Sequence, residues 1–176
     1  MTTKVIISTL FLTIVVFALK ILFFSNITSA NYTFETVLDG LDDAWSFEFI
    51  NEDTILYTEM SGKLKIASLS DKSIQEIKNV PSVQYLGQGG LSEVVLDPDF
   101  KLNKKIYISY SSTDQNGKST LFLSSAELRN NALSNSKVIF EANAPRKTPL
   151  HLGGKIAFLD DGTILFTSGE DRKSVV

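Results

Sequence analysis

The segment from Pro149 to Asp171 contains the only histidine of the chain, His151. An imidazole can accept a proton near neutral pH, so it is suited to act as a general base on an alcohol hydroxyl. Gly153 and Gly154 follow it, and because glycine has no side chain, a flat cofactor or a sugar could approach their backbone closely. A loop histidine is more often a plain exposed polar residue, so both interpretations stay open here.

A second candidate residue is Gln88, which lies among the glycines of the segment 87–90. Its amide can both donate and accept hydrogen bonds in a binding pocket, although the same residues are also typical of a turn or a β-bulge. The segment is not a phosphate-binding loop, because no Lys-Ser/Thr pair follows at the required spacing. The run Asp97 to Ile108 lacks the glycine and glutamate of a calcium-binding EF-hand loop, so we assign no metal ligands.

Composition excludes several classes of function. The chain has 17 basic and 20 acidic residues, a formal net charge of -3, and no basic run that would suit nucleic acid. It has no cysteine, which excludes disulfides, thiolate nucleophiles and cysteine-based metal sites.

Residues 1–30 are predicted to be an export signal. Lys4 provides a positive start, an apolar run extends from Val5 to Phe24, and Thr28-Ser29-Ala30 resembles a signal-peptidase site. The apolar run approaches the ~20 residues of a spanning helix, so an uncleaved membrane anchor is the alternative. We therefore expect an exported protein, periplasmic or extracellular, that contacts a membrane only if this segment is retained.

Residues 31–176 are predicted to form an all-β fold with a repeat of 50 to 60 residues. The sequence from Phe49 to Thr58 is closely paralleled from Phe158 to Thr167, and a third strong strand is expected at Ile106–Tyr110. Repeats of this length, each made of short strands, indicate the blades of a β-propeller, with a β-sandwich as the alternative. We expect about three blades, little helix beyond the signal, and Trp45 in a blade core.

Four segments in this order resemble the soluble PQQ-dependent glucose/sorbosone dehydrogenases, most closely the aldose sugar dehydrogenases. They are Gly40–Phe49 with Thr58–Leu64, the Gly87-Gln88-Gly89-Gly90-Leu91 segment, the Asp97-Pro98-Asp99-Phe100 and Ile106–Tyr110 pair, and His151–Phe158 with Asp161-Gly162. The resemblance covers almost all of residues 31–176, and four motifs in order are more specific than any one of them.

The resemblance implies a six-bladed β-propeller that binds PQQ and calcium and oxidises the C1 hydroxyl of aldoses. It implies that His151 is the general base and that hydride passes to the quinone. Gln88 would line the same pocket, and Gly153 and Gly154 would lie beside the cofactor. Leu150 stands where the glucose dehydrogenase branch has an aspartate, and Lys155 stands where the family usually has an arginine.

The resemblance also implies that the remaining PQQ contacts and the calcium ligands lie outside these residues. We therefore expect an N-terminal part of a longer enzyme, a truncated propeller that is inactive alone. Its partners would be an aldose and an unknown electron acceptor. The alternative function is a non-catalytic propeller that binds a glycan or a protein.

Overall fold

The computed structural model describes residues 32–113, 117–143 and 150–169, and the chain divides into two units, residues 1–36 and 37–176. Of the first unit, only residues 32–36 are described, and they belong to no helix or strand. The predicted signal or anchor, residues 1–30, lies outside the described residues. Among the described residues, no helix is long and apolar enough to cross a membrane.

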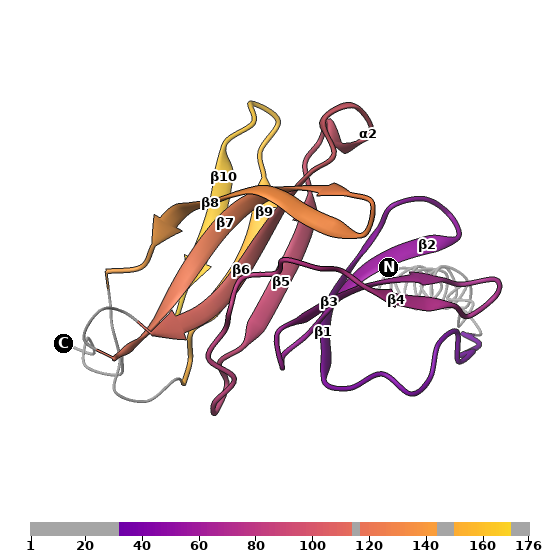
Figure 1. Ribbon diagram of the computed structural model, residues 1–176, viewed down its shortest axis with the longest axis horizontal. Coiled ribbons are helices and arrows are strands. Elements are labelled where there is room, and N and C mark those ends of the chain that lie inside the picture. The colour runs from indigo at the N-terminus through magenta and orange to yellow at the C-terminus, as the bar shows by residue number, and fades with distance from the viewer. Residues whose placement is uncertain (1–31, 114–116, 144–149, 170–176) are drawn as a thin grey trace, which may run out of the picture. The chain divides into compact units, whose positions relative to one another are not determined.

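The second unit is built from three antiparallel sheets that follow one another along the chain (Figure 1). In each sheet, strands that are consecutive in the sequence lie next to one another, so each sheet is a simple meander. The first sheet contains β1 (Ala44–Phe49), β2 (Thr54–Glu59), β3 (Lys63–Ser68) and β4 (Ile74–Glu76). The second contains β5 (Leu91–Leu96), β6 (Lys105–Thr113), β7 (Ser119–Arg129) and β8 (Ala132–Glu141), and the third contains β9 (Gly153–Phe158) and β10 (Ile164–Ser168).

The first hairpin of each sheet has the same register, which confirms the predicted repeat. The equivalent cross-strand pairs are Phe49↔Ile55, Leu96↔Ile106 and Phe158↔Ile164. The first strands of successive sheets also lie against one another, β1 against β5 and β5 against β9. Successive meanders that meet at their first strands are the blades of a β-propeller, and the described residues form two four-stranded blades and the first hairpin of a third.

Apolar side chains from facing sheets form the contacts between blades. The main cluster joins the first and second blades and includes Leu56, Leu64, Leu91 and Ile108, each fully buried. Burying a side chain of this size contributes about 1.5–3 kcal/mol. A smaller cluster around Ile156 joins the second and third blades.

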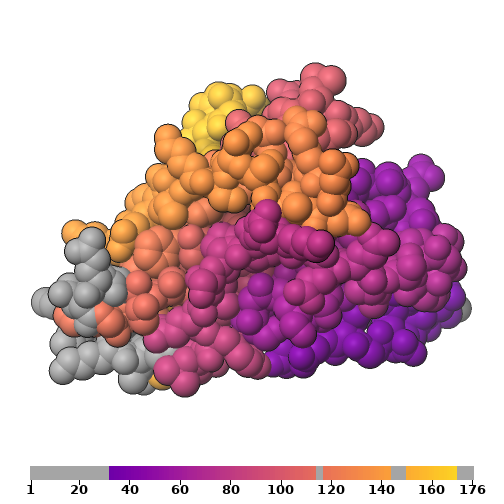
Figure 2. Space-filling model, in the orientation of Figure 1, coloured from indigo at the N-terminus to yellow at the C-terminus, as the bar shows by residue number. Residues whose placement is uncertain are grey.

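The segment between β4 and β5 also connects the first two blades. Lys78 pairs with Ala132 of β8, and the backbone amide of Gln84 donates to the carbonyl of Ser111 in β6 (2.8 Å). In Figure 2 this segment, coloured between purple and rose, runs across the junction of the two blades. The course of this segment matters because it carries Gln88 near its end.

Two expectations differ from the structure. Trp45 was expected in a blade core, but it is 61% exposed, because it lies with Phe47 and Phe49 on the face of β1 that is turned away from the second blade. The fourth strands β4 and β8 were not predicted. The expectation of little helix is confirmed for the described residues, which contain only the four-residue α2 (Phe100–Asn103).

Candidate active site

His151 lies two residues before β9, at the start of the third blade, and its side chain is exposed. Its backbone adopts a left-handed conformation, with φ of 53°. This conformation costs an L-residue about 1–2 kcal/mol, so the surrounding structure must hold it.

The backbone of His151 is held from the third blade itself. The amide of Gly169, after β10, donates to the carbonyl of Leu152 (2.7 Å). A Cβ atom on Gly169 would lie 1.7 Å from the carbonyl oxygen of His151, so only glycine permits this approach. Gly169 was not identified from the sequence, where it looks like an ordinary turn residue.

The second blade provides a further contact to the same residue. The backbone N–H of His151 donates to Oε1 of Gln88 (2.8 Å), although the two residues are 63 positions apart. The structure therefore brings together the two residues singled out in the sequence, through the backbone of His151 and the side chain of Gln88. Because Oε1 is the acceptor in this bond, the amide group of Gln88 is left to act toward a ligand as a donor.

The loop that carries Gln88 is packed closely between the first two blades. The amide of Gly90 donates to Oγ of Ser111 (2.7 Å), and the amide of Leu91 donates to the carbonyl of Met60 (3.1 Å). A Cβ atom on Gly90 would lie 2.0 Å from that carbonyl oxygen. Gly90 thus allows the loop to pack closely against its neighbours, and this packing fixes the position of the Gln88 backbone.

Gly153 and Gly154 also pack closely against protein atoms. A Cβ atom on Gly153 would lie 2.8 Å from the amide nitrogen of Gly169, and one on Gly154 would lie 3.0 Å from Oγ of Ser109. Both have positive φ, 80° and 112°. The structure thus provides a packing reason for both glycines, and their approach to a cofactor stays a prediction.

Three charged side chains, one from the first strand of each blade, lie near one another. Lys155 of β9 forms an ion pair with Glu93 of β5, whose side chain is 11% exposed. Burial raises the pKa of Glu48 of β1, with Lys155 opposing the rise and Glu93 adding to it. Sequence reasoning missed this ion pair. Aligning the repeats could have found it, because Glu93 and Lys155 occupy equivalent positions on neighbouring first strands.

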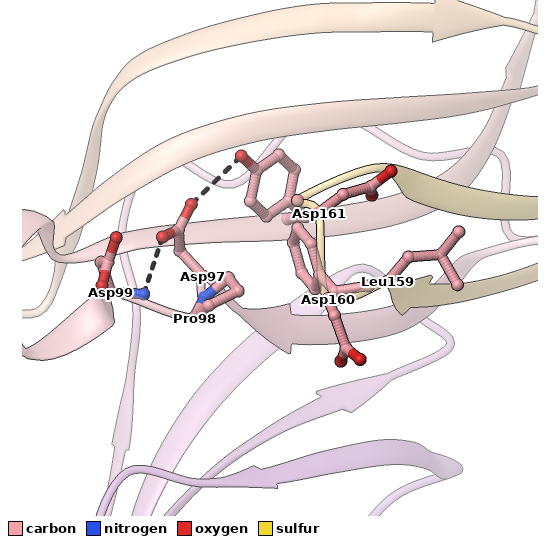
Figure 3. A pocket seen from close by; sticks show the side chains of 9 residues that line it. Asp97, Pro98, Asp99, Leu159, Asp160 and Asp161 are labelled. Carbon is pink, nitrogen blue, oxygen red and sulfur yellow. Dashed lines mark hydrogen bonds between the residues drawn. The ribbon is translucent and has the colours of Figure 1, made fainter.

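A cavity of about 520 Å³ lies at the opposite end of β9, away from His151, between the β9–β10 turn and the end of β5 (Figure 3). Burial raises the pKa of Asp97, but hydrogen bonds from Asn103, from the amide of Asp99 and from the Tyr107 hydroxyl outweigh it and leave that pKa below its usual range. The Asp97 carboxylate is thus held by hydrogen bonds from its own loop and from β6. Among the described residues, no group of three or more side chains suited to a metal ion occurs.

Fold and site together define a class: a β-propeller in which a histidine and a glutamine from adjacent blades meet at the start of an inner strand. The chain belongs to the glucose/sorbosone dehydrogenase family, whose model matches residues 41–175. This confirms the predicted family.

The chain is similar to the aldose sugar dehydrogenase YliI of Escherichia coli (strain K12), with 28% identity over 147 residues. That match covers 82% of this chain and 40% of the relative. A solved glucose dehydrogenase is 34% identical with a TM-score of 0.76, over 81% of this chain and 42% of that one. The PQQ-bound aldose sugar dehydrogenase of Streptomyces coelicolor shares the fold, with 22% identity, a TM-score of 0.66, and coverage of 81% and 45%. The chain thus spans about two fifths of the length of these proteins.

Proposed function

We propose that the protein is a PQQ-dependent dehydrogenase that oxidises the C1 hydroxyl of aldose sugars, and that this chain supplies its general base. The observation that carries the proposal is the contact between His151 and Gln88 in a chain of this family. Aldose and glucose dehydrogenases are among its relatives, and one neighbour of the same fold binds PQQ.

His151 would remove the proton of the C1 hydroxyl as hydride leaves C1, so that the aldose becomes the lactone. Its side chain is exposed at the blade edge, where a hydroxyl can come within hydrogen-bonding distance of about 3 Å. The Gln88 amide group would donate to an oxygen of the substrate or the cofactor. A quinone, when bound, supplies the hydride acceptor, and the protein supplies the position and the base.

The described residues fit the two proposed groups differently. His151 and Gln88 form an exposed polar pair that suits a quinone or a sugar, and Gly153 and Gly154 remain candidates beside it. Calcium does not fit the described residues, since they contain no suitable cluster of ligands. We therefore assign no calcium ligand and no step to calcium in this chain.

The test compares the His151→Asn variant of the full-length protein with the wild type, each after incubation with PQQ and calcium. Asparagine tolerates the left-handed conformation at this position, so the backbone should be preserved while the base is lost. We expect aldose-dependent dye reduction to fall by about 100-fold or more, because general-base catalysis contributes roughly 10²–10⁴-fold. An unchanged circular dichroism spectrum is the control, and near-normal turnover would remove His151 from the mechanism.

We also propose that the protein is exported, that its electron acceptor is a separate molecule, and that residues 1–176 alone are inactive. The first rests on the sequence of residues 1–30. The last rests on the length of the chain, which spans 40% and 42% of two of its relatives. Dye reduction by residues 1–176 alone would contradict it. If the full-length protein folds but does not oxidise aldoses, the alternative of a non-catalytic propeller that binds a glycan or a protein is favoured.

A further inference from the structure

Gln88 is carried by a short loop, residues 84–90, that belongs to no helix or strand. The middle of the loop is exposed, whereas its last two residues are buried. Within it, the amide of Gly89 donates to the carbonyl of Leu86 (2.9 Å), which closes a turn with Gln88 at its second central position. A turn of this size does not fix its own place on the protein, so Gln88 is placed by the groups that hold the two ends of the loop.

Both ends of this loop are held by one residue of the second blade, Ser111 of β6, which is fully buried. Its main chain accepts from the amide of Gln84 (2.8 Å) and donates to the carbonyl of Gly90 (2.9 Å). Its hydroxyl accepts from the amide of Gly90 (2.7 Å) and donates to the carbonyl of Gln84 (3.1 Å). The hydroxyl thus joins the first and last residues of the loop and closes it beneath the turn that carries Gln88.

The loop is packed directly onto this hydroxyl. A Cβ atom on Gly89 would lie 2.5 Å from Oγ of Ser111 and 2.9 Å from the carbonyl oxygen of Gln84. Without the hydroxyl, the buried amide of Gly90 loses this acceptor, and an unpaired buried amide is costly. We therefore expect the loop to shift when the hydroxyl is removed.

The other two blades show that the hairpin itself does not need a hydroxyl at this position. By the register that aligns Ile55, Ile106 and Ile164, the residues equivalent to one another are Met60, Ser111 and Gly169. In each blade the amide of this residue donates to a carbonyl just before the first strand, and the acceptors are Asp43 (3.1 Å), Gly90 (2.9 Å) and Leu152 (2.7 Å). Methionine and glycine close their hairpins in the same way as serine does, so the two hydroxyl bonds of Ser111 serve the loop.

We propose that Ser111 is a positioning residue of the candidate active site, whose hydroxyl sets the loop so that Oε1 of Gln88 meets the backbone amide of His151. That bond measures 2.8 Å. Ser111 acts through Gln88 and is not itself a catalytic residue. The hydrogen bonds are observed in this chain, whereas an effect of Ser111 on turnover rests on the proposed function.

The exposed part of the loop has weaker attachments. The hydroxyl of Tyr85 donates to the carboxylate of Asp43 before the first blade, and the amide of His151 donates to Gln88 at the third. Both bonds are exposed, so water competes with each of them. The buried bonds of Ser111 are therefore the ones whose loss should let Gln88 move while the blades stay folded.

Ser111→Ala in the full-length protein tests the placement of Gln88. The readout is hydrogen exchange of the His151 amide after selective ¹⁵N labelling of histidine, with the signal assigned by its absence from His151→Asn. We expect exchange to become roughly two- to tenfold faster, as for the loss of one hydrogen bond. An unchanged rate in the folded variant would overturn the proposal.

Two further variants control this measurement. Ser124→Ala removes another buried hydroxyl of the same sheet, one that bonds to the Tyr110 hydroxyl, and should leave the exchange rate unchanged. Ser111→Cys nearly keeps the size of the side chain but bonds only weakly, so it replaces Ser111→Ala if that variant does not fold. Equal acceleration by Ser124→Ala would mean that any buried hydroxyl of the sheet has this effect, and the proposal would be wrong.

A double-mutant cycle separates positioning from general loosening. In a Gln88→Leu background the bond to His151 is already absent, so Ser111→Ala should add no further acceleration. A merely structural role of Ser111 would speed exchange by the same factor in both backgrounds. That result would overturn the proposed action through Gln88.

Turnover of an aldose, with PQQ and calcium supplied, tests the consequence for catalysis. Ser111→Ala should lower kcat by roughly tenfold or more, because a base displaced from its productive position loses much of its effect. Ser124→Ala should not lower it. Faster exchange with normal kcat would overturn the catalytic consequence of the placement. A wild type that oxidises no aldose would instead contradict the proposed function and leave the exchange result standing.

Discussion

Gln88 contacts His151 through the backbone of the histidine, so it can position this residue without touching the imidazole. The bond from the His151 amide to Oε1 holds a backbone that is left-handed at φ of 53°. A residue in such a conformation persists only where neighbouring groups determine it. Gln88 is thus a positioning residue in addition to any contact that its amide group makes with a ligand.

Gln88→Leu removes the acceptor, while Gln88→Glu retains an oxygen in its place. The bond is exposed and should be worth about 0.5–1.5 kcal/mol, so Gln88→Leu should speed hydrogen exchange of the His151 amide roughly two- to tenfold. Gln88→Glu should leave the exchange rate nearly unchanged. Selective ¹⁵N labelling of histidine gives one backbone signal, because the chain has one histidine. Equal rates in both variants would contradict the positioning role.

Glu48 makes the folded state sensitive to pH. Burial raises its pKa, Lys155 on β9 opposes this, and Glu93 on β5 adds to it. A carboxyl group whose pKa is raised in the folded state contributes most stability below its unfolded pKa, and this contribution is lost as pH rises through the folded pKa. Ionised Glu48 therefore destabilises the fold at neutral pH.

Glu48→Gln should accordingly raise the free energy of unfolding at pH 7. The gain should vanish below about pH 4.5, the ordinary glutamate pKa, where Glu48 is protonated in both states. Urea unfolding at several pH values measures the difference, with Glu52→Gln on the exposed β1–β2 turn as the control. A gain that persists unchanged at low pH would show that charge is not its cause.

At the scale of elements, local pattern predicted the strands that alternation and turns define. The second strands of the blades were expected, because β2 and β6 are rich in β-branched and aromatic residues and end at turn residues. β4 is three residues long and wholly exposed, and most of β8 is exposed, so neither has a buried face to reveal it. Both strands are placed by pairing with β3 and β7, which is a tertiary contact.

The loop between the first and second blades depends on Gly90 in a way that residue type alone does not reveal. Gly90→Ala would place a Cβ atom 2.0 Å from the Met60 carbonyl, in addition to an unfavourable φ of 149°. Gly117 also has positive φ, 72°, but a Cβ atom there would meet nothing within 4 Å. Comparison of the two alanine variants therefore separates a steric clash from backbone strain.

Gly117→Ala should lower the free energy of unfolding by about 1 kcal/mol, the cost of a left-handed L-residue. Gly90→Ala should lower it by about 3 kcal/mol or more, because backbone atoms of β2–β3 and of the loop must move apart. Chemical denaturation measures both. Similar losses in the two variants would mean that the loop relaxes freely around position 90.

At the scale of the whole molecule, the relation between blades is what the sequence could not provide. The order of strands and the candidate residues His151 and Gln88 were readable locally, but their contact depends on how the second blade packs on the third. The same holds for Trp45, whose exposure depends on whether another blade covers the outer face of β1.

The second blade shares apolar clusters with both of its neighbours, so the described blades should unfold together. Leu91 and Val94 of β5 pack with the first blade, and Val95 of the same strand packs with the third. Loss of either contact therefore exposes apolar surface on β5 and weakens the other. The only tryptophan, Trp45, reports on the first blade, and the only histidine, His151, reports on the third.

Urea unfolding of residues 1–176, followed by Trp45 fluorescence and by the NMR signal of the His151 imidazole, should give coincident midpoints. Leu91→Ala should lower both midpoints together, with a loss of about 2–5 kcal/mol, because it opens a cavity at a fully buried position. Leu102→Ala, at an exposed position of α2, should move neither. If the histidine signal changes before the tryptophan emission, the third blade is an independent unit, and the contact between His151 and Gln88 then opens without unfolding of the first two blades.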